Sequence, residues 1–288
     1  MTKIKLSAAI ATYNEEENIA ECLDSIKDIV DEIVIVDGSS TDKTVEIARK
    51  YNAVIVITDN PPIFHINKQK AFDKASGEWV LYLDADERVS KPLGQEILRV
   101  ISMDNSQIED YQQSINKRKL FLRHQHLLEE RDGKIGTVDG DYVAFFFPRL
   151  NYFLGKFLKY GGVYPDGVIR LFKNNKAYLP AKDVHEQMVV DGKVGWLAND
   201  LVHYDSKTFS RYLQRNSRYI DLLAADLREQ HLKKTLFNFV DYTFIKPTHW
   251  FLMTSIRNKG ILDGPQGLIF SFFSALRFPR AYWRYITK

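Results

Sequence analysis

Strand-like runs alternate with helical patterns from the start of the chain to Leu83, and this alternation constrains the fold more than any other feature. The strand-like runs cover residues 5–11, 32–36, 53–58 and 79–83, and helical patterns fill the intervals at about 16–29, 41–51 and 66–75. Continuous Val- and Ile-rich strands separated by helices indicate a parallel sheet covered on both faces. We therefore expect an α/β, Rossmann-like, mostly parallel sheet with helices on both faces.

Polar residues follow three of these four runs, at the point where each run ends. They are Thr12, Asn14, Glu15, Asp37, Ser39, Asp84 and Asp86. In open parallel sheets, ligands bind beyond the carboxyl ends of the strands. Each residue alone could simply cap a helix or make a turn. Because three strand ends carry such residues at one expected edge, we interpret them jointly as a ligand site.

The run 79–83 ends in two carboxylates, Asp84 and Asp86, separated by Ala85. If the strand continued, these carboxylates would face one side while Ala85 faced the other, and Glu87 would point away from the pair. Two close carboxylates repel unless a cation joins them. Hard divalent ions such as Mg²⁺ or Mn²⁺ take oxygen ligands and are often completed by substrate phosphates. The pattern D-x-D alone is common, so the interpretation depends on its surroundings.

Charge is distributed unevenly along a chain whose formal net charge is only +3. From Lys233 to the C-terminus, nine Lys or Arg stand against two Asp, a charge of +7, which leaves −4 for the first 232 residues. This asymmetry indicates an anionic surface as a partner of the tail. Nucleic acid is not expected, because the positive charge accompanies an apolar stripe and not a groove of stacking aromatics.

The single cysteine, Cys22, excludes an intrachain disulfide and fits a reducing compartment. The N-terminal residues lack the apolar length and cleavage site of a secretory signal. No apolar run approaches the roughly 20 residues that span a bilayer. These features predict a protein that is cytosolic or peripheral on a membrane.

The rest of the chain divides into three predicted parts. Residues 104–140, with one charged helix expected over 107–130, are interpreted as an insertion, and residues 141–206 as short strands and turns. Residues 207–288 are expected to form a helical, amphipathic, basic extension. In that extension Leu268, Phe272 and Leu276 recur at helical spacing, and three arginines, Arg277, Arg280 and Arg284, mark a basic face. A helix of this kind lies at a membrane interface or packs on the protein's own core.

Several blocks of the sequence resemble the inverting family 2 glycosyltransferases of the GT-A fold in order and spacing. The blocks are IATYNEEENIAECLDSI, EIVIVDGSSTDKTVEIA and KASGEWVLYLDADERV. The later blocks NYFLGKFLKYGGVYPDGVIRLF, DVHEQMVVDG and LVHYDSKTFSRYLQRNSRY resemble the subgroup that builds bacterial lipopolysaccharide core and related surface glycans. The resemblance implies residues 1–206 as the GT-A catalytic domain, with 1–103 as its nucleotide-binding half and 141–206 as its acceptor and catalytic half.

The resemblance also implies roles for individual residues. Those implied to bind a UDP-sugar donor are Thr12, Asn14, Glu15, Asp37, Ser39, Lys68, Gln69, Asp84, Ala85, Gly161 and Gly162. Asp86 and His203 are implied to hold Mg²⁺ or Mn²⁺. Glu186 occupies the position of the catalytic base, and His185 beside it stays a candidate, because this chain has His-Glu where many members have Glu-Asp.

The implied reaction is single-displacement transfer of a sugar from a UDP-sugar to a glycan or lipid-linked acceptor in cell-envelope biosynthesis. Two alternatives stay open at this point. One is a non-catalytic module that keeps the fold and binds a membrane or partner through its tail. The other is a sugar nucleotidyltransferase, although its glycine-rich basic loop is missing. A dinucleotide-dependent oxidoreductase would need a glycine fingerprint after the first strand, and residues 12–15 contain no glycine.

Overall fold

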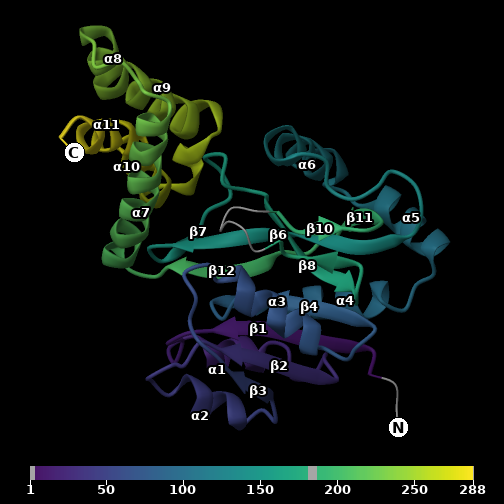
Figure 1. Cartoon of the computed structure of the whole chain (residues 1–288). Coiled ribbons are helices and arrows are strands. Elements are labelled where there is room, and N and C mark those ends of the chain that lie inside the picture. The colour runs from purple at the N-terminus through teal and green to yellow at the C-terminus, as the bar shows by residue number, and fades with distance from the viewer. Residues whose placement is uncertain (1–3, 181–186, 288) are drawn as a thin grey trace. The chain divides into compact units, whose positions relative to one another are not determined.

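A computed structural model describes residues 4–180 and 187–287 of the chain (Figure 1). The chain forms two compact units, unit 1 with residues 1–149 and 165–203, and unit 2 with residues 150–164 and 204–288. The chain therefore passes between the units three times. The longer segment of unit 2 begins at residue 204, close to the boundary expected between residues 206 and 207. Unit 2 also includes 150–164, because Phe153 and Leu158 form an apolar cluster with Tyr212.

Unit 1 is built on one sheet with the strand order β3-β2-β1-β4-β8-β6-β12-β5. Its first four strands pair in parallel. They are β1 (Leu6–Thr12), β2 (Glu32–Asp37), β3 (Val54–Ile57) and β4 (Trp79–Leu83). The predicted parallel sheet is thus confirmed nearly residue for residue, because each strand is a short apolar run with a polar end.

Three helices connect these strands, α1 (Ile19–Asp24), α2 (Thr44–Arg49) and α3 (His65–Lys74). Right-handed crossovers place helices on one face when the chain moves outward along a sheet and on the other face when it returns. The chain moves outward from β1 to β3 through α1 and α2, which contact each other, and returns to β4 through α3, which packs on β1 and β2 (Figure 1). Helices therefore cover both faces, as predicted.

Later strands extend the sheet mainly in antiparallel fashion. β8 (Asp166–Lys173) pairs antiparallel with β4 and with β6 (Tyr142–Phe153), and β12 (Leu201–Ser206) pairs antiparallel with β5 (Glu87–Val89). β11 (Lys193–Trp196) joins β6 in parallel, and β9 (Ala177–Tyr178) pairs with β10 (Val189–Val190) in a separate two-stranded sheet. The sheet is parallel where the sequence alternates strand and helix and mixed beyond that point.

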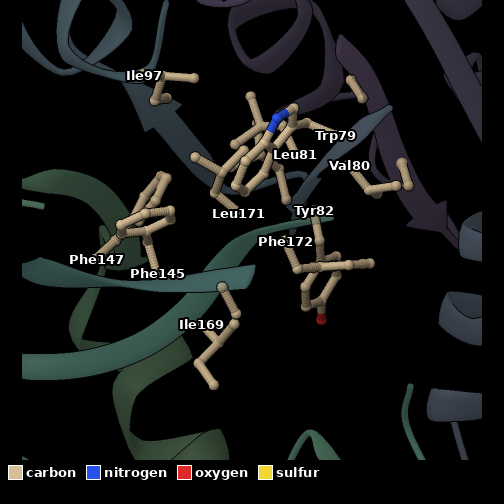
Figure 2. Close-up of a cluster of buried hydrophobic side chains, with 14 of the residues drawn as sticks. Trp79, Val80, Leu81, Tyr82, Ile97, Phe145, Phe147, Ile169, Leu171 and Phe172 are labelled. Carbon is tan, nitrogen blue, oxygen red and sulfur yellow. The ribbon is translucent and has the colours of Figure 1, made fainter. Parts of the chain in front are cut away.

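The core of unit 1 lies where β4, β6 and β8 meet. Figure 2 shows Trp79, Leu81, Phe145, Leu171 and Phe172 in this cluster, and each is at most 2% exposed. Trp79 and Val80 lie opposite Lys173 and Phe172 in the pairing of β4 with β8. This apolar layer fixes the end of β4, and hence the starting point of the acidic segment that follows.

The segment 104–140 is part of this core. It forms α5 (Asn105–Ser114) and α6 (Arg118–Asp132), which follow α4 (Lys91–Val100). The expectation of one helix over 107–130 was wrong, because Ile115 adopts an extended conformation (φ −66°, ψ 116°) and its side chain is buried. Phe121 is fully buried and stacks on Trp196 with ring centroids 4.7 Å apart.

Unit 2 is mostly helical, as predicted, apart from the short strand β7 (Lys156–Phe157) and the end segments of β6 and β12. Its helices are α7 (Phe209–Glu229), α8 (Leu236–Val240), η1 (Asp241–Ile245), α9 (Lys246–Leu252), η2 (Met253–Arg257), η3 (Gly260–Asp263), α10 (Pro265–Ala275) and α11 (Arg277–Thr287).

A buried carboxylate, Asp263, ties the early loop of unit 2 to these helices. Its side chain is 3% exposed and Oδ2 accepts the backbone N–H groups of Lys159 and Tyr160 at 3.0 and 2.9 Å. Gly161 then donates its N–H to the carbonyl of Asn258 at 2.8 Å. The loop that precedes residue 165 is therefore held by residues about a hundred positions later in the sequence.

Candidate active site

The ends of β1 and β2 are joined by a network of hydrogen bonds around the buried side chain of Asp37. Asp37 is fully buried, and its carboxylate accepts the hydroxyl of Thr12 at 2.7 Å and the N–H and hydroxyl of Ser40 at 2.7 and 2.6 Å. Asn14 Oδ1 accepts the N–H of Thr41 at 2.8 Å. The network holds the two strand-end loops together, while Asn14 and Ser39 stay exposed at the edge.

Two non-glycine residues of these loops adopt positive φ, Asn14 at 53° and Ser39 at 63°. Such conformations are uncommon and cost free energy unless the surroundings impose them. Here the surroundings do so, since the Ser39 hydroxyl donates to the carbonyl of Thr58 at 2.9 Å and the N–H of Glu15 donates to Thr44 Oγ1 at 2.7 Å. The loops are pre-organised at the sheet edge.

The acidic segment after β4 forms a turn and does not continue the strand. The N–H of Glu87 donates to the carbonyl of Asp84 at 2.9 Å, so strand alternation does not set the directions of Asp84 and Asp86 as expected. Asp84 Oδ1 lies 2.6 Å from Lys68 Nζ, and Asp84 Oδ2 lies 2.6 Å from Arg170 Nη2. Asp86 Oδ2 instead lies 3.5 Å from His203 Nε2.

Glu87 lies on the same side as Asp84 and is fully buried, so the expectation that it points away from both aspartates was wrong. Its Oε1 lies 2.8 Å from Arg170 Nη2 and 3.3 Å from Arg149 Nη1. Its Oε2 accepts the N–H of Asp84 at 3.0 Å, so Glu87 supports the loop. Arg170 therefore bridges two carboxylates three residues apart in the turn.

The charges of this network shift the titration of its members. Burial alone would raise the pKa of Asp84, but Lys68 and Arg170 outweigh burial and hold that pKa well below its usual range. Burial alone would lower the pKa of Lys68, but Asp84 outweighs burial and raises it. Asp84 is therefore a carboxylate, and Lys68 an ammonium, throughout the neutral range.

A cavity of about 300 Å³ opens on this network within unit 1. Lys68 and His65 from α3, Tyr82 and Asp84 from the end of β4, Arg149 from β6 and Arg170 from β8 are among its lining residues. A larger hollow of about 550 Å³ lies beside Asp31, Glu32 and Val54, at the opposite, amino ends of the strands. The smaller cavity lies at the carboxyl end of β4, where ligands bind in open α/β sheets, so it is the candidate site.

Asp86 lies in the turn before β5 and His203 lies in β12. Their side chains are close together although the residues are 117 positions apart in the sequence. Both side chains are largely buried, at 14% and 7% exposed. Among residues 4–180 and 187–287, no three His, Cys, Asp or Glu side chains gather closely enough to hold a metal ion by themselves. The pair can supply two ligands, one oxygen and one nitrogen, with the remaining positions left to substrate and water.

The remaining predicted site residues lie in several places. Gln69 Oε1 accepts the N–H of Leu179 at 2.8 Å, and Ala85 is buried with its carbonyl accepting Arg88 Nη1 at 2.7 Å. Gly161 and Gly162 belong to unit 2, with φ of 73° and 80°. The predicted bases His185 and Glu186 lie outside the described residues.

Sequence reasoning missed Arg170 and Arg149. Arg170 interrupts the apolar run of β8, Val168–Phe172, where a charged residue is costly unless it is paired. An arginine inside an apolar strand was therefore the sequence signal that could have identified Arg170 as a site residue. Arg170 makes its pairs with Asp84 and Glu87, and its guanidinium lies 4.1 Å from the ring centroid of Tyr82.

A parallel sheet ordered β3-β2-β1-β4, with an acidic turn after β4 and mixed strands beyond it, defines the GT-A class of α/β proteins, as predicted. The chain belongs to glycosyl transferase family 2, whose family model matches residues 7–172. The predicted family is thereby confirmed. No helix in the described part of the chain combines the length and apolar character needed to cross a membrane.

Two curated relatives illustrate the range of similarity. An uncharacterized glycosyltransferase of Rickettsia conorii is 42% identical over 103 residues, which cover 35% of this chain and 36% of that protein. The lipopolysaccharide core biosynthesis glycosyltransferase LpsC of Rhizobium meliloti is 26% identical over 309 residues, which cover 99% of this chain and 95% of that protein. The chain thus matches about a third of the first relatives' length but nearly all of LpsC.

Among solved structures, glucosyl-3-phosphoglycerate synthase of Mycobacterium tuberculosis in complex with Mn²⁺ and UDP-glucose is 27% identical to this chain. The match covers 31% of this chain and 36% of that one, with a TM-score of 0.28.

Proposed function

We propose that this chain transfers a sugar from a UDP-sugar to a hydroxyl group of a cell-envelope glycan or its lipid-linked precursor, with inversion at the anomeric carbon. Family membership supports glycosyl transfer, and the similarity to LpsC along the whole chain supports a lipopolysaccharide-core-like acceptor. We place the reaction at the cytoplasmic face of the inner membrane, as the resemblance implies. The observation that carries the proposal is the approach of Asp86 to His203 beside the Asp84 cavity.

Asp86 and His203 fit a divalent metal. A carboxylate oxygen and an imidazole nitrogen 3.5 Å apart can both ligate one ion, and Mn²⁺ accepts both ligand types. Two protein ligands leave room for diphosphate oxygens and water, which is the usual arrangement for Mg²⁺ at phosphate substrates. A bound Mg²⁺ or Mn²⁺ would supply positive charge to a departing diphosphate.

The chain's own residues bind and orient the donor in this proposal. Asn14 and Ser39, exposed on loops fixed by Asp37, are candidates for contact with the nucleoside. Asp84 lines the cavity as a carboxylate, and its ion pairs with Lys68 and Arg170 hold its side chain in one position. It can therefore accept hydrogen bonds from sugar hydroxyls without a change of rotamer. Pre-organised groups of this kind lower the reorganisation needed to reach the transition state.

In the proposed reaction, Glu186 takes the proton of an acceptor hydroxyl as that oxygen attacks the anomeric carbon. The new carbon–oxygen bond forms as the bond from the anomeric carbon to the diphosphate oxygen breaks, and both electrons of the broken bond leave with the diphosphate. An α-linked donor therefore becomes a β-linked product. Positioned general bases contribute about 10²–10⁴-fold. His185 is the second candidate for this role.

Release of UDP from UDP-sugars, with and without Mn²⁺, tests the proposal. Asp86→Asn should lower Mn²⁺-dependent UDP release at least about 100-fold and weaken Mn²⁺ binding measured by calorimetry, because it removes a charged ligand. Asp139→Asn, at an exposed position, is the matched control and should behave as wild type. Glu186→Gln should lose transfer and keep Mn²⁺ binding.

Three results would overturn the proposal or a part of it. Full activity and full Mn²⁺ affinity in Asp86→Asn would remove the Asp86–His203 pair from the site. Transfer at the wild-type rate by Glu186→Gln would remove Glu186 as the base. Folded wild-type protein that binds no UDP-sugar and releases no UDP would favour the non-catalytic alternative.

A further inference from the structure

Unit 2 exposes large apolar side chains over residues 236–262. We call the six side chains Leu236, Phe237, Phe244, Ile245, Ile256 and Leu262 the ridge. Each is between 52% and 78% exposed. Scattered exposed apolar residues are normal, but several from one short stretch mark an interaction surface. The ridge is therefore a candidate surface for a partner.

Most of the ridge follows from one run of helix. α8, η1, α9 and η2 succeed one another without a break from Leu236 to Arg257. Tyr242 and Thr254 face inward and are buried, whereas Phe237, Phe244 and Ile256 are exposed. An interval of seven residues is close to two helical turns, so Phe237 and Phe244 lie on the same side of the helix. The run therefore exposes large apolar side chains outward while Tyr242 and Thr254 pack inward.

Positive charge accompanies the ridge. Between Lys233 and Leu262 the chain carries five cations, Lys233, Lys234, Lys246, Arg257 and Lys259, and one acid, Asp241. Asp241 Oδ2 lies 3.1 Å from Lys246 Nζ, so that acid is paired within the same run. Two cations lie at the start of the run and two at its end, and all four are exposed. The ridge therefore combines apolar side chains with an excess of positive charge at both ends.

The three arginines of the predicted basic face, which lie on α11, make contacts within unit 2 itself. Arg284 Nη1 lies 2.8 Å from Asp221 of α7 and donates to the carbonyl of Ser217 at 2.9 Å. Arg280 Nη1 donates to Asn216 Oδ1 at 3.5 Å, and Arg277 lies 4.1 Å from the ring centroid of Trp250. The arginines of α11 contact α7 and α9, which favours the second of the two arrangements left open for this helix, packing on the protein's own core.

We propose that the ridge docks on an anionic lipid bilayer and lies in its interface. An amphipathic helix with apolar and aromatic residues on one side and flanking cations binds such a surface in the plane of the headgroups. Cations near an anionic leaflet add roughly 1 kcal/mol each, about a fivefold gain in partition per residue. Charge complementarity favours this occupant over a second copy of the chain, which would bring like charges together.

Flotation of the full chain with vesicles tests the inference independently of catalysis. Wild type should float with phosphatidylcholine vesicles that contain phosphatidylglycerol and bind pure phosphatidylcholine vesicles at least about fivefold more weakly. Phe244→Asp should lower partition at least about tenfold, because burial of a Phe side chain is lost and a like charge is added. Tyr219→Asp on α7 is the matched control, since Tyr219 is 58% and Phe244 59% exposed.

Two further measurements separate the possible outcomes. Circular dichroism should show the same melting curve for both variants, so that loss of flotation reports the surface and not unfolding. The double variant Lys233→Gln with Lys234→Gln should weaken binding to anionic vesicles toward the level seen with neutral ones and leave binding to neutral vesicles unchanged. No flotation of wild type, or equal flotation of Phe244→Asp and wild type, overturns the inference. A dimer in light scattering that Phe244→Asp dissociates, with no vesicle binding, assigns the ridge to self-association and overturns it as well.

Discussion

Replacement of Glu87 by Gln should destabilise unit 1 strongly, although the two side chains have nearly the same shape. Glu87 is fully buried, and its carboxylate faces Arg170 at 2.8 Å and Arg149 at 3.3 Å. Gln keeps an oxygen that can accept the N–H of Asp84 but removes the negative charge. Breaking a buried ion pair by removing one partner costs about 3–5 kcal/mol.

The structure places the expected cost at the lower end of that range. Arg170 retains Asp84 at 2.6 Å and Arg149 retains Asp166 at 2.7 Å, so neither guanidinium is left without a carboxylate. We therefore expect about 3 kcal/mol, which corresponds to a fall in melting temperature of roughly 6–12 °C for a unit of this size. Urea denaturation followed by far-UV circular dichroism measures the free energy of unfolding directly.

Glu109→Gln is the matched control. Glu109 makes a 2.7 Å ion pair with Lys193, but its side chain is 43% exposed, and exposed pairs contribute about 0–1 kcal/mol. The two variants carry the same chemical change and differ in burial. A cost below about 1 kcal/mol for Glu87→Gln, equal to that of Glu109→Gln, would refute the reasoning that burial makes this carboxylate necessary.

Two other predictions concern the core and the acid range. Phe121→Ala should destabilise unit 1 by about 3–5 kcal/mol, because it removes the fully buried ring that stacks on Trp196. The control Leu127→Ala, at a side chain that is 54% exposed, should change the urea midpoint little. Equal urea midpoints for the two variants would contradict the placement of 104–140 in the core. Because the pKa of Asp84 is lowered on folding, its stabilising contribution is present above the usual value of about 3.9 and is lost as pH falls through the lowered pKa. The Lys68→Met variant should therefore begin to lose stability at a higher pH than wild type, measured as the free energy of unfolding in urea at several pH values below about 5. The same fall in stability with pH in both proteins would count against the pairing of Lys68 with Asp84.

The first four strands could be predicted from the sequence because each is a short apolar run whose neighbours are helices of regular period. The antiparallel pairing of β8 with β4 could not, since Trp79 meets Lys173 through a contact between distant segments. The break at Ile115 was missed for a related reason. The helix ends where the side chain of Ile115 is buried in the core of unit 1, and no proline or glycine marks this position in the sequence.

The candidate site divides in the same way. The strand ends predicted that Thr12, Asp37 and Asp84 lie at one edge of the sheet, because chain direction alone brings them there. The directions of the side chains were not predictable from strand alternation, since residues 84–86 form a turn. Asp86 and His203 have no local pattern in common, and only resemblance to a family connected them before the structure placed them 3.5 Å apart.

The anchorage of Lys159 and Tyr160 on Asp263 has a consequence for the order in which the protein is made. The loop leaves the ribosome 104 residues before the carboxylate that holds Lys159 in place. At about 5–20 residues per second, that interval lasts roughly 5–20 s. During it, α7 is made, but residues 150–164 still lack Asp263 and α10, so unit 2 can complete its fold only after α10 has been synthesised. A chain that stops before Asp263 loses the anchor of a loop it has already made.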